Sequence, residues 1–286
     1  MSSNLKIGTC SWKYPSWAGL VYESKKPDNY LEEYAKHYQS VEVDQWFWSL
    51  FGEDKIVLPK KAVVEAYNQS VPDDFKFVIK APNSLSLTHL YKQYSGGKLV
   101  QNPHFLSPEL YDNFLYTLAP IRSKIGAISL QFEYLNKQKM PSAESFLGQF
   151  VQFLKNVDTS IPICMEIRNP NFLTTTYFQL LKDHGIGHTF CQGYYMPDIR
   201  DVYEKHAPHI QGTSIIRLLG PDRQGIEEKT QKSWDKIVLP RDDEIAGIAK
   251  LIKKMVARSG MDIYLNVNNH YEGSAPITIQ KMLAYL

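Results

Sequence analysis

The sequence lacks the features of a secreted or membrane-spanning protein. Its 286 residues contain no apolar run of bilayer length, and the opening MSSNLKIGTC lacks the basic and then apolar organisation of a secretory signal. Only three cysteines occur, Cys10, Cys164 and Cys191, without C-x-x-C spacing. This scattered, odd-numbered set argues against a disulfide scaffold or a zinc knuckle. We therefore expect a cytoplasmic protein with no membrane partner, whose cysteines are buried as small apolar residues.

The sequence also has no large excess of positive or negative charge. The 32 Lys and Arg residues nearly balance the 30 Asp and Glu residues, which leaves a net charge of +2. Nucleic-acid-binding domains usually carry a clear basic excess, so nucleic acid is an alternative partner and not the favoured one. The H-x-H and H-E-x-x-H patterns of metal sites are absent as well. The sequence therefore assigns no cofactor and no metal ligand, although a divalent metal stays open as an alternative.

Strand-like runs alternate with helical segments along the whole chain. Hydrophobic residues make up 43% of the sequence, which is typical of a packed globular protein. The strand candidates are residues 5–10, 40–44, 75–81, 126–132, 162–168, 187–191, 213–219 and 262–268. Eight strands in strict alternation with helices predict a single α/β domain over residues 1–286, a (β/α)8 TIM-type barrel. A doubly wound open sheet is the alternative, but no G-x-G-x-x-G follows the first strand.

The segments between the strands carry helix signals and two long connections. Helical periodicity covers residues 28–38, 107–118, 142–157, 174–185, 242–260 and 274–286. Asp28 and Ser107 are predicted N-caps, and Gly185 is a predicted stop. The connections 83–106 and 220–240 follow the third and seventh strands. In a barrel they lie on the C-terminal face, where substrate-binding loops are found.

Polar side chains collect at the carboxyl ends of six predicted strands. Because strand side chains alternate, the more apolar face packs under the helices and the other points into the barrel. The inward set at the mouth is Glu42, Lys80, Gln131, Glu166, Arg168, Arg217, Asn268 and His270. Buried charges are costly unless they are paired, so this repetition indicates a ligand or catalytic site. A structural network, for example Glu42 with Arg217, is the alternative.

The closing stretch YLNVNNHYEGSAP, residues 264–276, ends the last strand in amides and an imidazole. Its alternation directs Asn268 and His270 into the mouth. Asn269 falls on the opposite phase and is expected to hold the turn through backbone groups. Gly273 lets the chain reverse, and Ser274 is expected to cap the last helix.

These segments resemble, in order, the motifs of the domain-of-unknown-function 72 (DUF72, YecE-like) family. The matching pieces are IGTCSWKYPSWAGLVY, VEVDQWFWSL, FKFVIKAPNSLSLTH, LQFEY, MEIRNPNF, IIRLLG and VNNHYEGSAP. The resemblance implies a TIM barrel and supplies no reaction. By fold analogy the family is similar to xylose-isomerase-like and endonuclease-IV-like barrels. The chain departs from the family pattern at residues 44–48, at Glu133 in place of proline and at Leu219 in place of histidine. Such changes would alter which ligand the protein binds if these positions contact the ligand.

The mouth residues favour an enzyme, a hydrolase or lyase, that binds an anionic small molecule, a phosphodiester or a phosphosugar. Acid–base catalysis is assigned to Glu42, Glu166 and His270. Substrate binding is assigned to Trp12, Lys80, Gln131, Arg168, Arg217 and Asn268, with the cations as anion clamps. One alternative is a metal-dependent, endonuclease-IV-like hydrolase. Another is a barrel that binds nucleic acid or protein without catalysis, through the aromatic and basic stretches 10–26 and 192–205.

Overall fold

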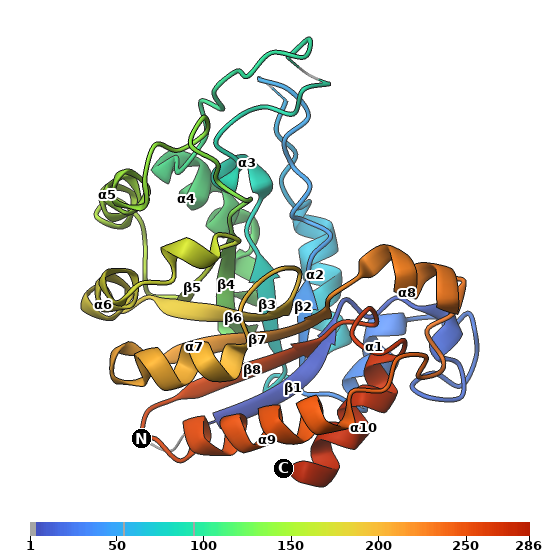
Figure 1. The fold of residues 1–286 in the computed structure, drawn as a ribbon. Helices are drawn as coiled ribbons and strands as arrows, with labels where there is room; N and C mark the ends of the chain where they lie inside the picture. Colours follow the sequence, from blue (N-terminus) through green and yellow to red (C-terminus); the bar gives the residue numbers. More distant parts are fainter. Residues whose placement is uncertain (1–3, 54, 94) are drawn as a thin grey trace.

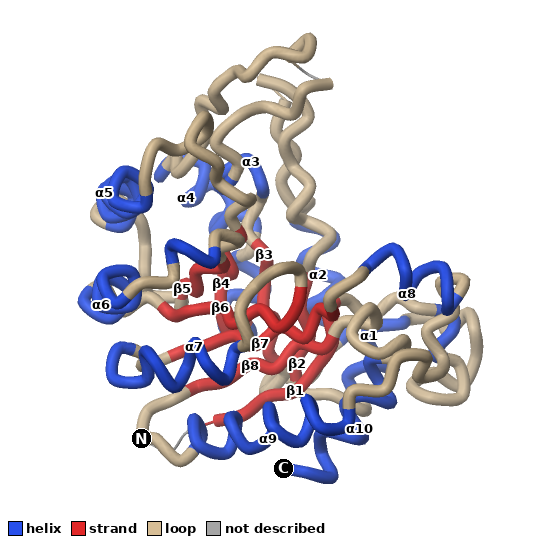
Figure 2. The backbone as a smooth tube through the Cα atoms, in the orientation of Figure 1, coloured by secondary structure: helices blue, strands red, loops and turns tan. Residues whose placement is uncertain are grey.

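The strands of the chain form one closed parallel barrel. The computed structural model describes residues 4–53, 55–93 and 95–286. The strands follow one another around the barrel in chain order, and β8 closes it against β1 (Figures 1 and 2). They are β1 Asn4–Cys10, β2 Ser40–Val43, β3 Lys76–Lys80, β4 Ile125–Gln131, β5 Ile163–Glu166, β6 Gly187–Gly193, β7 Thr213–Gly220 and β8 Asp262–Val267. The predicted (β/α)8 TIM-type barrel is confirmed.

Helices surround this barrel, and the six predicted helical segments are all present. They contain α1 Tyr30–Ala35, α4 Pro108–Thr117, α5 Ala143–Leu154, α6 Thr175–Asp183, α9 Asp242–Val256 and α10 Ala275–Tyr285. The sequence pattern missed α2 Lys61–Ser70, α7 Ile199–His206, α8 Arg223–Thr230 and the short helix α3 Asn83–Ser86. Of these, α2 and α7 bury only short apolar stripes and are stabilised mainly by packing on the barrel.

Two of the predicted helix caps are wrong and one is confirmed. Asn29, not Asp28, caps α1, because its side chain accepts hydrogen bonds from the next backbone N–H groups. Ser107 caps α4 as predicted. Ser274 precedes α10 without capping it; instead the Asn269 side chain accepts a hydrogen bond of 2.9 Å from the backbone of Ala275. The expected role of Asn269 in the closing turn is therefore confirmed.

The two faces of the strands separate as their alternation predicts. The outward side chains, among them Val41, Ile79 and Leu130, join the large core under the helices. A smaller apolar layer fills the barrel interior and consists of Val78, Ala127, Cys164, Ile215 and Tyr264. All three cysteines are free and buried, as expected. Polar groups are thereby left for the carboxyl end of the barrel.

Long loops extend from that end of the barrel. The segments after β2 and β3 project together beyond the barrel at the top of Figure 1, and Leu50, Leu87 and Leu90 form a separate cluster between them. The long connections after β3 and β7 were predicted, whereas the one after β2 was not. The connection after β7 contains α8. In the part of the chain that the structure describes, no helix combines the length and apolar character needed to cross a membrane.

Candidate functional site

Arg217 stands at the centre of the barrel mouth. It projects from β7, and its Nε and Nη2 each donate a hydrogen bond of 2.7 Å to Glu42 on β2. Its Nη1 donates to both oxygens of Glu166 at the end of β5, at 3.0 and 2.9 Å. The same nitrogen lies 3.4 Å from Oε1 of Gln131 on β4. All the charged groups of this set are buried, so the pairing of Glu42 with Arg217 considered from the sequence is present.

A second arginine completes this set. Arg168 lies two residues beyond Glu166, and its Nη2 donates to Glu166. Burial alone would raise the pKa of Glu166, but the charges of Arg168, Arg217 and Lys80 outweigh burial and lower that pKa to about 2. Glu166 is therefore ionised at neutral pH. We refer to Glu42, Glu166, Arg168 and Arg217 as the ion network.

Arg168 has guanidinium nitrogens that take no part in the hydrogen bonds of the ion network. Its guanidinium carbon lies 5.6 Å from the ring centroid of Tyr194, which follows β6. The side chain is 17% exposed, whereas that of Glu166 is fully buried. Within the described residues, Nη2 is the only Arg168 nitrogen with a hydrogen-bond partner. Donors of Arg168 are thus without a hydrogen-bond partner among the described residues.

Lys80 lies beside the ion network at the end of β3. Its Nζ is 4.2 Å from the ring centroid of Phe47, and the residue is 7% exposed. The amine has no hydrogen bond to any residue that the structure describes. Burial, and then the charge of Arg217, lower the pKa of Lys80, although nearby carboxylates oppose them. Burial, and then Glu42, raise the pKa of the neighbouring Asp44.

Asn268 and His270 lie in a separate group. The Asn268 side chain accepts a hydrogen bond of 2.9 Å from the backbone of His270, and His270 Nε2 lies 3.0 Å from Glu227 of α8. The His270 ring also packs edge-on against Trp234. Burial lowers the pKa of His270, and the hydrogen bond to Glu227 opposes that shift. Among the described residues, neither Asn268 nor His270 contacts the ion network.

The remaining predicted residue, Trp12, is almost buried. It is 5% exposed and packs edge-on against Tyr67 of α2, with ring centroids 5.2 Å apart. Asn266 lies on the inward face of β8 and was not predicted as a site residue. Its Nδ2 lies 3.5 Å from Glu42 and is aligned to donate to that carboxylate. Because Asn266 lies on the same strand face as Asn268, strand alternation could have identified it as a site residue.

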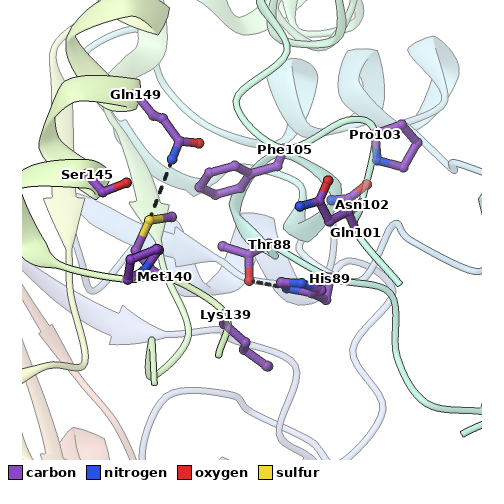
Figure 3. Close-up of a pocket in the computed structure, with 11 residues that line it drawn as sticks. Thr88, His89, Gln101, Asn102, Pro103, Phe105, Lys139, Met140, Ser145 and Gln149 are labelled. Carbon is purple, nitrogen blue, oxygen red and sulfur yellow. Dashed lines mark hydrogen bonds between the residues drawn. The ribbon is translucent and has the colours of Figure 1, made fainter. Parts of the chain in front are cut away.

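A polar cavity of about 490 Å³ opens between the segments that follow β3 and β4 (Figure 3). His89 Nδ1 lies 3.0 Å from Thr88 Oγ1, and that hydroxyl donates to Glu133 at 3.2 Å. Lys139 forms an ion pair with the same glutamate. Figure 3 shows Phe105 and Gln149 on the facing wall. Thr88 and His89 belong to the FKFVIKAPNSLSLTH motif, but the sequence did not indicate that Glu133 is their partner.

The described residues do not form a ligand set for the alternative metal site. Among residues 4–53, 55–93 and 95–286, no group of three or more His, Cys, Asp or Glu side chains is arranged to hold a metal ion. Glu42 and Glu166, the carboxylates of the ion network, are both bound to Arg217, whose positive charge would repel a cation between them.

The closed barrel of eight parallel strands, with charged side chains at its mouth, places this chain in the class of (β/α)8-barrel proteins with polar groups at the C-terminal face. The family model described as "Protein of unknown function DUF72" matches residues 6–286. The chain belongs to this family.

Comparisons with individual relatives agree with this assignment. The chain is 25% identical to the UPF0759 protein YecE of Escherichia coli (strain K12) over 167 residues, 58% of this chain and 49% of that protein. The match thus spans about half the length of that curated relative.

Solved structures show the shared fold. A DUF72 family protein from Enterococcus faecalis V583 superposes with a TM-score of 0.69 at 20% identity, covering 99% of this chain and 95% of that chain. One from Thermotoga maritima MSB8 gives 0.67 at 18% identity, covering 98% and 97%. At this identity the likeness concerns the fold alone, and the function has to be argued from the site.

Proposed function

We propose that the barrel mouth binds a small anionic molecule, a phosphosugar or phosphodiester, and acts on it through carboxylate acid–base chemistry. The observation that carries this proposal is a difference between neighbouring cations. Arg217 donates from all three of its guanidinium nitrogens to protein groups, whereas Arg168 and Lys80 keep donors without a protein partner in the described chain. A ligand anion is the natural partner of such donors.

The roles within the proposed site follow from these contacts. Arg168 binds the anionic group of the ligand, and the Lys80 amine contacts the same ligand from β3. Arg217 acts as a positioning residue, because it fixes the carboxylates of Glu42 and Glu166 by paired hydrogen bonds. Since Glu166 is ionised, it accepts a proton in this scheme and does not donate one.

The test is titration of the full chain with inorganic phosphate and ribose 5-phosphate, with neutral ribose as the control ligand. Arg168→Gln should weaken ribose 5-phosphate binding about tenfold or more, the loss of one charged hydrogen bond. Lys80→Met should also weaken it, by the loss of a hydrogen bond from the amine. The matched control variants are Arg122→Gln and Lys155→Met, which change exposed cations away from the mouth. The proposal fails if the control variants weaken binding as much, or if ribose binds as tightly as its phosphate.

A second candidate is the binding of single-stranded nucleic acid across the mouth. Large aromatic side chains are exposed in three segments that follow strands: Trp48 after β2, Tyr134 after β4 and Tyr195 after β6. Exposed rings stack readily on bases. In contrast, the aromatic stretch 10–26 supports this function poorly, because Trp12, Trp17 and Tyr22 are buried in the core.

Binding of a short oligothymidylate strand at increasing salt concentration separates the two candidates. Nucleic-acid binding requires an affinity that falls steeply with salt and that Tyr195→Ala weakens. If the strand does not bind, or if Tyr195→Ala has no effect on its affinity, the second candidate is excluded.

A further inference from the structure

We propose that Lys80 is a nucleophile that forms an imine with the carbonyl carbon of a small phosphorylated aldehyde or ketone. This inference rests on the proposed function and deepens it: Arg168 holds the phosphate while Lys80 reacts with the carbonyl group. It assigns a covalent role to a residue that the sequence indicated only as a binding group.

The surroundings of the Lys80 amine favour its neutral form. The side chain shares its strand face with Val78, a member of the apolar layer inside the barrel. The Phe47 ring, whose centroid lies 4.2 Å from Nζ, opposes this effect through a cation–π contact. Only 7% of the residue is exposed, and no described residue accepts a hydrogen bond from the amine. A buried ammonium ion without acceptors is costly, whereas a neutral amine in the same place costs much less.

A neighbouring cation acts in the same direction. Burial is the main cause that lowers the pKa of Lys80, and Arg217 is the next. The carboxylates of Glu42 and Glu166 oppose this shift, but both already pair with Arg217. An amine that is desolvated and lies beside a second positive charge is a known arrangement for an activated lysine.

Unpaired polar atoms lie beside Lys80 and Arg217 in the barrel interior. Ser129 on β4 is the register partner of Lys80, and its Oγ is fully buried without a hydrogen bond among the described residues. Oδ1 of Asn266, the register partner of Arg217, is likewise buried and unpaired. Buried polar groups normally find partners, so these atoms suit the hydroxyl groups of a bound sugar-like molecule.

The reaction needs no oxidant or reductant. The Nζ lone pair bonds to the carbonyl carbon, and the carbonyl oxygen takes up a proton to give a carbinolamine. The nitrogen then loses two protons as the C=N bond forms. One is returned to the group that protonated the carbonyl oxygen, and the other leaves with the hydroxyl group as water. Asp44, which lies close enough for its charge to act on Lys80, is the proposed proton donor and acceptor, and burial raises the pKa of its carboxyl group.

The test uses dihydroxyacetone phosphate with sodium cyanoborohydride, which reduces an imine to a stable secondary amine. The full chain is labelled at pH 7.5, digested, and analysed by peptide mass spectrometry. We expect Lys80 to be labelled faster than exposed Lys155, because a lowered pKa raises the neutral, nucleophilic fraction of the Lys80 amine at pH 7.5. Labelling of Lys80 no faster than that of Lys155 overturns the proposal.

Two further measurements keep the test decisive. Lys80→Arg should abolish the fast label, and urea unfolding of the variant shows whether it is folded. If that variant does not fold, the pH dependence of labelling in the unaltered chain decides: the midpoint for Lys80 must lie below that for Lys155, and coincident midpoints overturn the proposal.

Neutral dihydroxyacetone separates this inference from the proposed function. Faster labelling of Lys80 by the phosphate, reduced in Arg168→Gln to the rate of the neutral ketone, supports both. Equal rapid labelling by the two ketones supports the nucleophile and contradicts the anion site. Phosphate binding without selective labelling supports the anion site and overturns the nucleophile.

Discussion

Arg217 and Glu42, which lie 175 residues apart in the chain, form a two-point ion pair inside the barrel, with two hydrogen bonds of 2.7 Å. Glu166 occupies the remaining side of the same guanidinium group. The arginine therefore holds two buried carboxylates at fixed positions, and the behaviour of the mouth depends on it.

Arg217→Gln should strongly destabilise the protein. The substitution leaves two buried carboxylates without their main partner, which is expected to lower the free energy of unfolding by about 3–5 kcal/mol. Urea unfolding measures the change. As a control, Arg122→Gln removes an exposed ion pair with Asp158 and should lower that free energy by no more than about 1 kcal/mol. Similar losses for the two variants would show that the buried pair has no special importance.

Glu166→Gln should remove part of the acid sensitivity of the fold. Because the pKa of Glu166 is lowered from 4.5 to about 2, its ionised form stabilises the folded state above pH 4.5, and this contribution is lost as the pH falls toward 2. The contribution is on the order of 3 kcal/mol. Urea unfolding between pH 7 and pH 2 should show the wild-type advantage shrinking below pH 5. A pH-independent difference between the two proteins would contradict this pKa.

His270→Gln tests the catalytic role predicted for His270 from the strand pattern. The ring contacts Glu227 of α8 and not the ion network, so the variant should loosen α8 and leave ribose 5-phosphate affinity within about threefold. Amide hydrogen exchange in α8 and calorimetric titration measure the two effects. A larger loss of affinity, with unchanged exchange in α8, would place His270 in the ligand site.

Asn83→Ala should release the loop that follows β2. The Asn83 side chain accepts hydrogen bonds of 3.0 Å from the backbones of Ser49 and Leu50 and from the Ser49 hydroxyl. Removing this buried acceptor should lower the free energy of unfolding by about 1–3 kcal/mol. Amide exchange at Ser49 and Leu50 should accelerate. Asn113→Ala, on the exposed face of α4, is the control and should change neither quantity appreciably.

The fold was predictable to a large extent because its signals are local. Alternation along Lys76–Lys80 and Asp262–Val267 assigned the inward faces correctly, and Ser107 and Gly185 marked the ends of helices. Helix α2 was missed because its weak local pattern becomes helical through packing on the barrel. Asp28 was chosen over Asn29 because adjacent capping residues are equivalent in sequence and are distinguished only by backbone direction.

The sequence by itself determined which polar residues stand at the ends of the strands, because a period of two leaves no other choice once the apolar face is buried. Only the tertiary structure decided their partners. Closure of the barrel brings Arg217 against Glu42 and Glu166, while α8 places Glu227 against His270. Lys80 is left beside these charges without a hydrogen bond to any described residue. Electrostatic pairing depends on distance across the barrel, and strand alternation does not encode that distance.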